Sequence, residues 1–225
     1  MKFADMKFAK DSKKSKKPKE ELAVTEELEG LEEEPLLPLM INFPLPPEIL
    51  KGSEESSLIL YGDIDEENAL DSIVLLLKNK LDEPLENSKH INFYVSSWGG
   101  SAADMFAIYD TMRLVRRNRE VHTYGLGKVM SAGVVLLAAG TRGKRFVGKN
   151  CRVMIHGVIA GSHGNLHNMQ NEIDEAMWTQ DKYIDALVES SDMTKKYIKK
   201  LIDRKVNVYL DAKEVVELGI ADEII

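Results

Sequence analysis

Cysteine is nearly absent from this sequence, since Cys151 is the single one among 225 residues. An internal disulfide framework is therefore excluded, and a reducing compartment fits best, so we expect a cytoplasmic protein. No apolar run approaches the roughly 18 to 20 residues that a membrane-spanning helix needs. The charged start also lacks the apolar segment of a secretory signal. We therefore expect neither a membrane association nor export.

A strong excess of one charge is also missing. The formal net charge is −7, and the basic residues beyond the N-terminus are scattered, so nucleic acid is not an expected partner. No glycine-rich phosphate loop with its lysine is found, which argues against ATP chemistry within this chain. His163 and His167 have no third ligand at a suitable spacing, so no metal is expected. We predict a protein that needs no cofactor.

Composition divides the chain into two parts. Residues 1–19 are rich in lysine, residues 20–34 are rich in glutamate, and residues 35–47 are rich in proline and leucine. Opposed charge blocks of this kind bury too little apolar surface to offset the entropy of ordering, so we predict a disordered extension and a proline-rich strap over residues 1–55. A propeptide or a docking arm is the alternative. Residues 56–225, with most of the apolar content, are predicted to form one domain.

Within this domain, strand patterns alternate with helix patterns. We predict strands over residues 58–61, 91–95, 121–124 and 152–155, and helices from Asp65 and over residues 102–115, 131–139, 166–188, 194–204 and 212–218. Such alternation is typical of an α/β domain with at least part of its sheet parallel.

Ser131 is the first candidate for a chemical role. It follows a predicted strand and a flexible loop and opens a small apolar helix, where the positive helix end would favour a developing oxyanion. Serine at this place is also an ordinary helix N-cap. The local pattern leaves both interpretations open.

Two other segments contain the remaining parts of an amide-hydrolysing site, which needs a base and donors for the oxyanion as well as a nucleophile. Gly99 and Gly100 follow a predicted strand, where backbone amides can approach a substrate without a Cβ in the way. His156 ends an apolar strand and could act as the general base. A tight turn and a structural histidine would produce the same pattern, so neither signal is specific alone.

Seven short sequence segments, taken together with their order along the chain, are a more specific signal than any single residue. Seven phrases occur in the order found in the Clp protease proteolytic subunit family, which residues 58–225 resemble: Tyr94-Val95-Ser96-Ser97-Trp98-Gly99-Gly100, Ile108-Tyr109-Asp110-Thr111-Met112, Met130-Ser131-Ala132-Gly133, Leu136-Leu137-Ala138-Ala139-Gly140, Gly143-Lys144-Arg145-Phe146, Met154-Ile155-His156 and Glu214-Val215-Val216-Glu217-Leu218-Gly219-Ile220-Ala221-Asp222.

This resemblance implies a ClpP/crotonase-like fold of repeated ββα units, with a protruding handle segment. It implies Ser131 as nucleophile and His156 as base, with the backbone N–H groups of Gly100 and Ala132 as the oxyanion hole. Substrate-binding roles for Gly99, Gly157 and Val158 are implied in the same way. The family further implies a homo-oligomer, a heptameric ring or two stacked rings, that encloses its active sites.

The sequence departs from the family at three places. The aspartate expected as third triad member falls on Asn207, which can orient an imidazole but cannot stabilise its charge. Asp203 is the second candidate for this role, and a loop shift could bring in Asp211. Val206 stands where an arginine helps to join the rings. Tyr94 keeps an aromatic of the family's unfoldase-binding pocket, whereas the family N-terminus is not recognisable in residues 1–57.

We therefore predict a serine endopeptidase that cuts unfolded polypeptides, fed by a AAA+ unfoldase. The alternatives are a processing peptidase of the phage capsid-maturation type and a catalytically weak or silent ring subunit. Acyl-CoA chemistry on the same fold is less well supported, because it does not need a serine and histidine pair.

Overall fold

A computed structural model describes residues 56–81 and 90–225. All of them belong to the unit Pro47–Ile225, the larger of two into which the chain divides. The predicted extension and strap, residues 1–55, lie outside the described residues.

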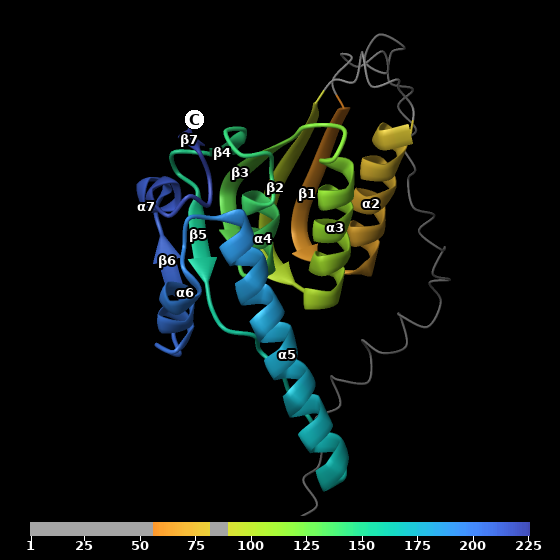
Figure 1. The fold of residues 1–225 in the computed structure, drawn as a ribbon, viewed down its shortest axis with the longest axis vertical. Coiled ribbons are helices and arrows are strands. Elements are labelled where there is room, and N and C mark those ends of the chain that lie inside the picture. The colour runs from red at the N-terminus through yellow and green to blue at the C-terminus, as the bar shows by residue number, and fades with distance from the viewer. Residues whose placement is uncertain (1–55, 82–89) are drawn as a thin grey trace, which may run out of the picture. The chain divides into compact units, whose positions relative to one another are not determined.

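The domain is built on a sheet whose main strands are parallel (Figure 1). The first three neighbours are β1 (Ser56–Ile64), β2 (Ile91–Gly100) and β3 (Val121–Met130). Beyond β3 the sheet divides, because β4 (Arg145–Val147) pairs with the start of β3 and β5 (Arg152–Ile155) pairs with its end. β7 (Glu223–Ile224) extends the sheet beside β4, and β6 (Val208–Leu210) pairs antiparallel with β5. The predicted α/β class with a parallel sheet is confirmed.

Three helices cover one face of the first strands (Figure 1): α2 (Glu66–Leu81), α3 (Ala102–Val115) and α4 (Ala132–Ala138). Side chains alternate between the two faces, as they must in a strand. Leu58 and Leu60 are buried beneath the helices, whereas Ile59 and Tyr61 are 71% and 70% exposed on the opposite face. Burial of one face of β1 therefore fixes the register of this strand. Its opposite face remains exposed and is not part of the core.

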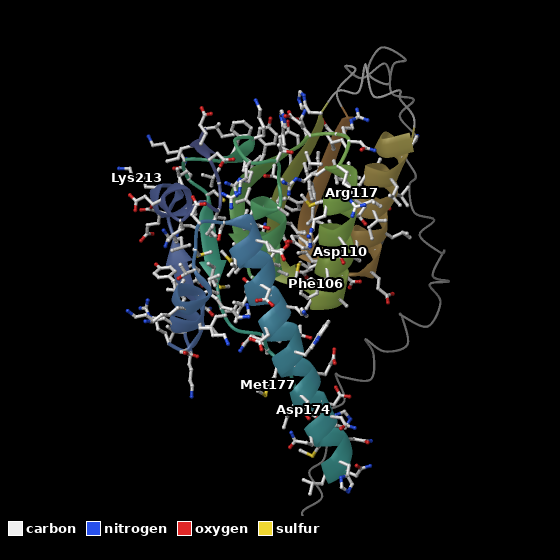
Figure 2. The ribbon with its side chains drawn as sticks, in the orientation of Figure 1. Phe106, Asp110, Arg117, Asp174, Met177 and Lys213 are labelled. Carbon is white, nitrogen blue, oxygen red and sulfur yellow. The ribbon has the colours of Figure 1, made fainter. Side chains whose placement is uncertain are left out.

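The long helix α5 (Leu166–Ser190) has two halves with different surroundings. Its last turns are buried against the domain through side chains such as Tyr183 and Leu187. Its first half projects away from the sheet, where Figure 2 shows Asp174 and Met177, and Met177 is 65% exposed. This projecting half, together with the irregular segment before it, is the handle that the family resemblance implied. The remaining helices are α6 (Lys195–Ile202) and α7 (Ala212–Glu217).

Some element boundaries were predicted incorrectly. β2 and β3 continue to Gly100 and Met130, beyond the predicted ends at residues 95 and 124. The glycines of β3 suggested a loop, but a Cβ on Gly125 would lie 2.9 Å from the Leu137 side chain of α4, so this glycine permits close packing of helix on strand. β4, β6 and β7 were missed because two or three residues are too few to show a period of two.

Candidate active site

Ser131 occupies the sharp turn between β3 and α4. Its φ of 55° and ψ of −123° are unusual for a residue with a side chain, and such a conformation persists only where its surroundings enforce it. Its N–H donates to the Met154 carbonyl at 2.8 Å. Its carbonyl accepts from the N–H of Val134 at 3.0 Å and from the Tyr183 hydroxyl at 3.3 Å. The backbone of Ser131 is thus held on both sides.

The Ser131 hydroxyl does not cap α4, although this residue occupies the N-cap position. In contrast, the N-cap side chains of α3, α5, α6 and α7 all accept backbone hydrogen bonds from their helices. The ordinary N-cap interpretation therefore does not explain this serine. Its hydroxyl remains available for other contacts.

The two glycines at the end of β2 lie beside this turn. A Cβ on Gly99 would be 2.6 Å from Ser131 Cβ, and one on Gly100 would be 2.1 Å from the carbonyl oxygen of Ile64. Gly99 also has a φ of +97°, which favours glycine. No side chain fits at either position, so the β2 backbone can lie directly against the serine.

A cavity of about 360 Å³ brings the predicted residues together. Gly157 and five other residues to which the resemblance gave a role line its walls: Gly100, Ser131, Ala132, His156 and Val158. Gly99 contributes by its contact with Ser131. The carboxyl end of β5 supplies His156, and the ends of β2 and β3 supply the glycines and the serine. Parallel strands that end at one edge explain why segments so distant in sequence meet here.

His156 is oriented by the main chain. Its Nδ1 lies 2.5 Å from the carbonyl oxygen of Gly157. Because a carbonyl oxygen only accepts, Nδ1 must carry the proton and donate it to this bond. The other ring nitrogen, Nε2, is then unprotonated in the neutral imidazole and has the lone pair that a general base needs.

Two candidates for a third triad member line a cavity together with His156 but make no hydrogen bond to it among the described residues. Asp203 and Asn207 line a second cavity of about 430 Å³, which His156 also lines. Among residues 56–81 and 90–225, no hydrogen bond joins His156 to either side chain. Asp211 is engaged elsewhere, since its Oδ1 accepts from the N–H groups of Lys213 at 2.9 Å and Glu214 at 3.0 Å, which caps α7. The role given to Asn207 stays a prediction.

Comparison with known families settles the relationship of the chain. A model of the Clp protease family matches residues 50–225. The chain belongs to the Clp protease family. The α/β fold with its parallel sheet is consistent with a ClpP-like fold, and the recognition from seven phrases is confirmed.

Three residues of this Clp protease family member were not predicted to matter at the site. Trp98 lines the cavity of Ser131 and is 59% exposed; it lies in the matched segment 94–100, in which the resemblance gave roles to the neighbouring glycines. Tyr183 lines the same cavity, and burial raises the pKa of its hydroxyl well above the usual range, so it stays a neutral donor. Gln180 lines the second cavity. Helix periodicity contains no signal that would single out either α5 side chain.

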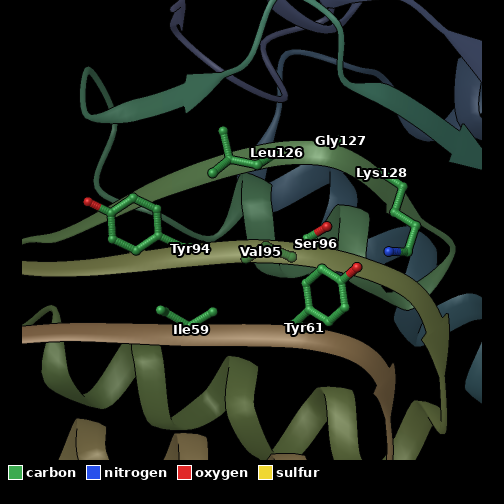
Figure 3. A pocket seen from close by; sticks show the side chains of 8 residues that line it. All are labelled: Ile59, Tyr61, Tyr94, Val95, Ser96, Leu126, Gly127 and Lys128. Atoms are coloured by element: carbon green, nitrogen blue, oxygen red, sulfur yellow. The ribbon is translucent and has the colours of Figure 1, made fainter.

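The outer face of the sheet contains a larger hollow of about 680 Å³ (Figure 3). The exposed side chains of Ile59 and Tyr61 line it, together with the half-buried Tyr94. The Tyr94 ring stacks on that of Tyr124, with centroids 4.7 Å apart. Lys128 Nζ lies 4.5 Å from the ring centroid of Tyr61 and 5.0 Å from that of Trp98, so one cation connects this hollow with the wall of the serine cavity. The predicted pocket aromatic, Tyr94, thus lies in a real apolar hollow.

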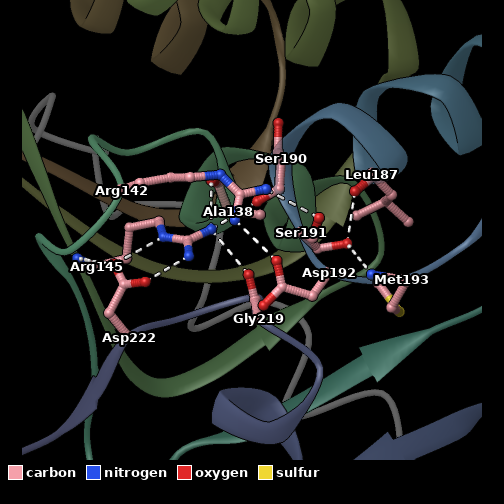
Figure 4. A network of polar contacts seen from close by, with 10 residues as sticks. All are labelled: Ala138, Arg142, Arg145, Leu187, Ser190, Ser191, Asp192, Met193, Gly219 and Asp222. Atoms are coloured by element: carbon pink, nitrogen blue, oxygen red, sulfur yellow. Dashed lines mark hydrogen bonds and ion pairs between the residues drawn. The ribbon is translucent and has the colours of Figure 1, made fainter.

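A buried ion pair joins two of the seven phrases to each other (Figure 4). Arg145, 1% exposed, donates through Nε and Nη2 to the Asp222 carboxylate, and through Nη1 to the carbonyls of Ser190 at 2.6 Å and Gly219 at 2.8 Å. Burial alone would raise the pKa of Asp222, but the hydrogen bonds and charge of Arg145 outweigh it and hold this pKa below its usual value. These phrases fasten the C-terminal segment to α5 and contribute no group to the serine cavity.

The described part of the chain contains neither a metal-binding cluster nor a membrane-spanning helix. No group of three or more His, Cys, Asp or Glu side chains in residues 56–81 and 90–225 is arranged to hold a metal ion, and His163 and His167 are both exposed. None of the helices in these residues is long and apolar enough to cross a membrane.

Proposed function

We propose that this protein is a serine endopeptidase in which Ser131 is the nucleophile and His156 the general base. One observation carries the proposal: the Ser131 hydroxyl caps no helix, and it shares a cavity with an imidazole whose Nδ1 is occupied by a main-chain carbonyl. That hydrogen bond leaves Nε2 to accept a proton. A merely structural serine and histidine would not need this arrangement.

The proposed reaction follows ordinary acyl transfer. Nε2 of His156 takes the hydroxyl proton while Ser131 Oγ bonds to the scissile carbonyl carbon, and the N–H groups of Gly100 and Ala132 stabilise the resulting oxyanion. The C–N bond then breaks, and His156 returns the proton to the leaving amine. Water attacks the acyl-enzyme by the same route and releases the acid. No cofactor takes part in these steps.

Extended polypeptide is the substrate that the cavity suits. Gly99, Gly157 and Val158 are proposed to bind its backbone, with Val158 acting through its carbonyl because its N–H already donates to Gln180. Trp98 and Met105 provide apolar walls for a side chain of the substrate. An unfolded segment is required, since a folded domain cannot present its backbone in so narrow a space.

Assembly and partners are proposed from the family and from the exposed surface. The handle presents Met177 and Trp178, 65% and 55% exposed, which favours burial in a homo-oligomer. A heptameric ring, single or doubled, would enclose the cavity. The hollow around Tyr94 is a suitable site for an apolar loop of a AAA+ unfoldase, which would supply the ATP chemistry. Such a machine would act in the cytoplasm.

A catalytically weak ring subunit is the second candidate, because neither Asp203 nor Asn207 hydrogen bonds to His156 among the described residues. Without a carboxylate the imidazolium is less stabilised, and rates should fall. The two functions differ only in turnover. A capsid-maturation type of processing has no observation that favours it.

The test is hydrolysis of an unstructured fluorogenic peptide by the purified protein without ATP. We expect turnover that both Ser131→Ala and His156→Gln reduce to background, with assembly unchanged by size-exclusion chromatography. Turnover that survives Ser131→Ala would exclude the serine mechanism. An assembled protein without any turnover would favour the silent subunit.

A further inference from the structure

The peptide that orients His156 is itself held by a side chain of α5. The carbonyl of the Gly157–Val158 peptide accepts from His156 Nδ1, and the N–H of the same peptide, that of Val158, donates to Gln180 Oε1 at 3.2 Å. A peptide is planar, so fixing its N–H fixes the direction of its carbonyl. Gln180 therefore controls the direction from which the imidazole is held.

Close packing leaves this peptide little freedom. A Cβ on Gly157 would lie 2.9 Å from Gln180 Oε1 and 3.0 Å from Ile202 Cγ2. Gln180 and Ile202 thus contact the Gly157 backbone directly, and a glycine is needed for them to do so. Gln180 is only partly buried, but it stands on the half of α5 that is anchored in the domain.

The same face of α5 also holds the nucleophile. Tyr183 follows Gln180 by one helical turn, so the two side chains lie on one side of the helix. The Tyr183 hydroxyl donates to the carbonyl of Ser131, which has a strained backbone. One rigid helix thus contacts the segments of both proposed catalytic residues.

We propose that Gln180 is a positioning residue for His156, acting through the Gly157–Val158 peptide and taking over the orienting task that a triad acid performs. Gln180 touches neither substrate nor reacting atoms. The inference rests on the proposed function, since it assigns a support to the base of that site. It also explains how the imidazole is oriented while Asn207 and Asp203 make no hydrogen bond to it among the described residues.

The test compares Gln180→Met, which removes the acceptor at nearly constant length, with Gln180→Glu, which keeps it. Gln170→Met is the matched control, because Gln170 lies on the exposed half of the same helix and its side chain donates a hydrogen bond to Asp174. For a fluorogenic peptide we expect Gln180→Met to lower kcat about tenfold, the upper end for one hydrogen bond. KM should stay within about twofold, since substrate contacts remain. Gln170→Met should match the wild type.

Gln180→Glu adds a pH readout. The retained acceptor should restore most of kcat, and the new carboxylate should favour the protonated imidazole, so the acid limb of kcat/KM moves to higher pH. Asp203 and Lys205 are the other charged residues that line the second cavity, and they are unchanged in every variant. Tyr183, which lines the serine cavity together with His156, is unchanged as well.

The outcomes separate cleanly. An active wild type with unchanged kcat in Gln180→Met, or a loss that Gln180→Glu does not restore, overturns the inference alone. If Gln180→Met does not assemble, the acid limb of Gln180→Glu decides: a shift supports the inference and an unshifted limb overturns it. A wild type that hydrolyses no peptide overturns the proposed function and this inference with it.

Discussion

The buried pair of Arg145 and Asp222 should be the most sensitive charged contact in the described residues. The perturbation is Asp222→Asn, which keeps the shape of the side chain and removes its charge. Arg145 and Asp222 side chains are 2% and 23% exposed, so the guanidinium would lose its countercharge in a place that water hardly reaches. Breaking a buried pair from one side costs about 3–5 kcal/mol. Because Arg145 keeps its main-chain acceptors, we expect about 3 kcal/mol.

A matched control lies beside this pair. Arg142 and Asp192 form a second ion pair at 2.8 Å, with side chains 52% and 64% exposed. Exposed pairs are worth about 0–1 kcal/mol. Asp192→Asn should therefore change the free energy of unfolding by less than about 1 kcal/mol, although the chemistry of the substitution is identical.

Urea unfolding at a fixed protomer concentration measures both variants. With a denaturant slope of about 3 kcal/mol per molar, Asp222→Asn should lower the midpoint by about 1 M and Asp192→Asn by much less. The pH dependence provides a second check. Since the folded pKa of Asp222 is lowered, the wild type has this stabilisation above the unfolded pKa of about 4 and loses it as the pH falls through the folded pKa. Equal midpoint shifts in the two variants would show that the buried pair stabilises the fold no more than the exposed pair does.

Three further predictions concern the site and the single thiol. Asn207→Ala should change kcat/KM for a fluorogenic peptide by less than about threefold, since no hydrogen bond joins Asn207 to His156 among the described residues; a loss above a hundredfold would restore Asn207 as third triad member. Trp98→Ala should lower kcat/KM about tenfold for peptides with large apolar side chains and hardly at all for alanine peptides, because the ring lines the serine cavity; an equal loss for both would contradict a specificity role. Burial raises the pKa of Cys151 to about 11, so native protein at pH 8 should resist iodoacetamide until urea unfolds it, as intact mass would show, and rapid native alkylation would be inconsistent with this.

Sequence patterns predicted the elements that a period can reveal. The bounds of α3 and β5 were predicted correctly: α3 is long enough to show a helical period, and β5 is a short continuous apolar run. β4, β6 and β7 exist only because longer neighbours pair with them, and no local pattern indicates such strands. Gly125 was placed in the flexible loop after the predicted strand 121–124, although it lies within β3 and makes room for Leu137, a contact that appears only after folding.

The residues of the candidate site likewise fall into those that the sequence predicted and those that only the structure reveals. Ser131, His156, Gly100 and Ala132 were selected through the family resemblance, and the fold brings them to one cavity. Sequence could not indicate the acceptor of His156 Nδ1, because a main-chain carbonyl is carried by every residue. Gln180 was equally hidden, since a glutamine on a helix is ordinary until the Val158 N–H is found beside it. Backbone contacts of this kind depend on tertiary structure alone.

The central claim is that Ser131 is an activated nucleophile, and covalent labelling tests it most directly. The folded, assembled protein is treated with a fluorophosphonate probe, and the modified residue is located by peptide mass spectrometry in the wild type, Ser131→Ala and His156→Gln. We expect modification at Ser131 in the wild type, strongly slowed labelling in His156→Gln and none at that position in Ser131→Ala. An assembled wild type in which Ser131 stays unmodified would contradict it.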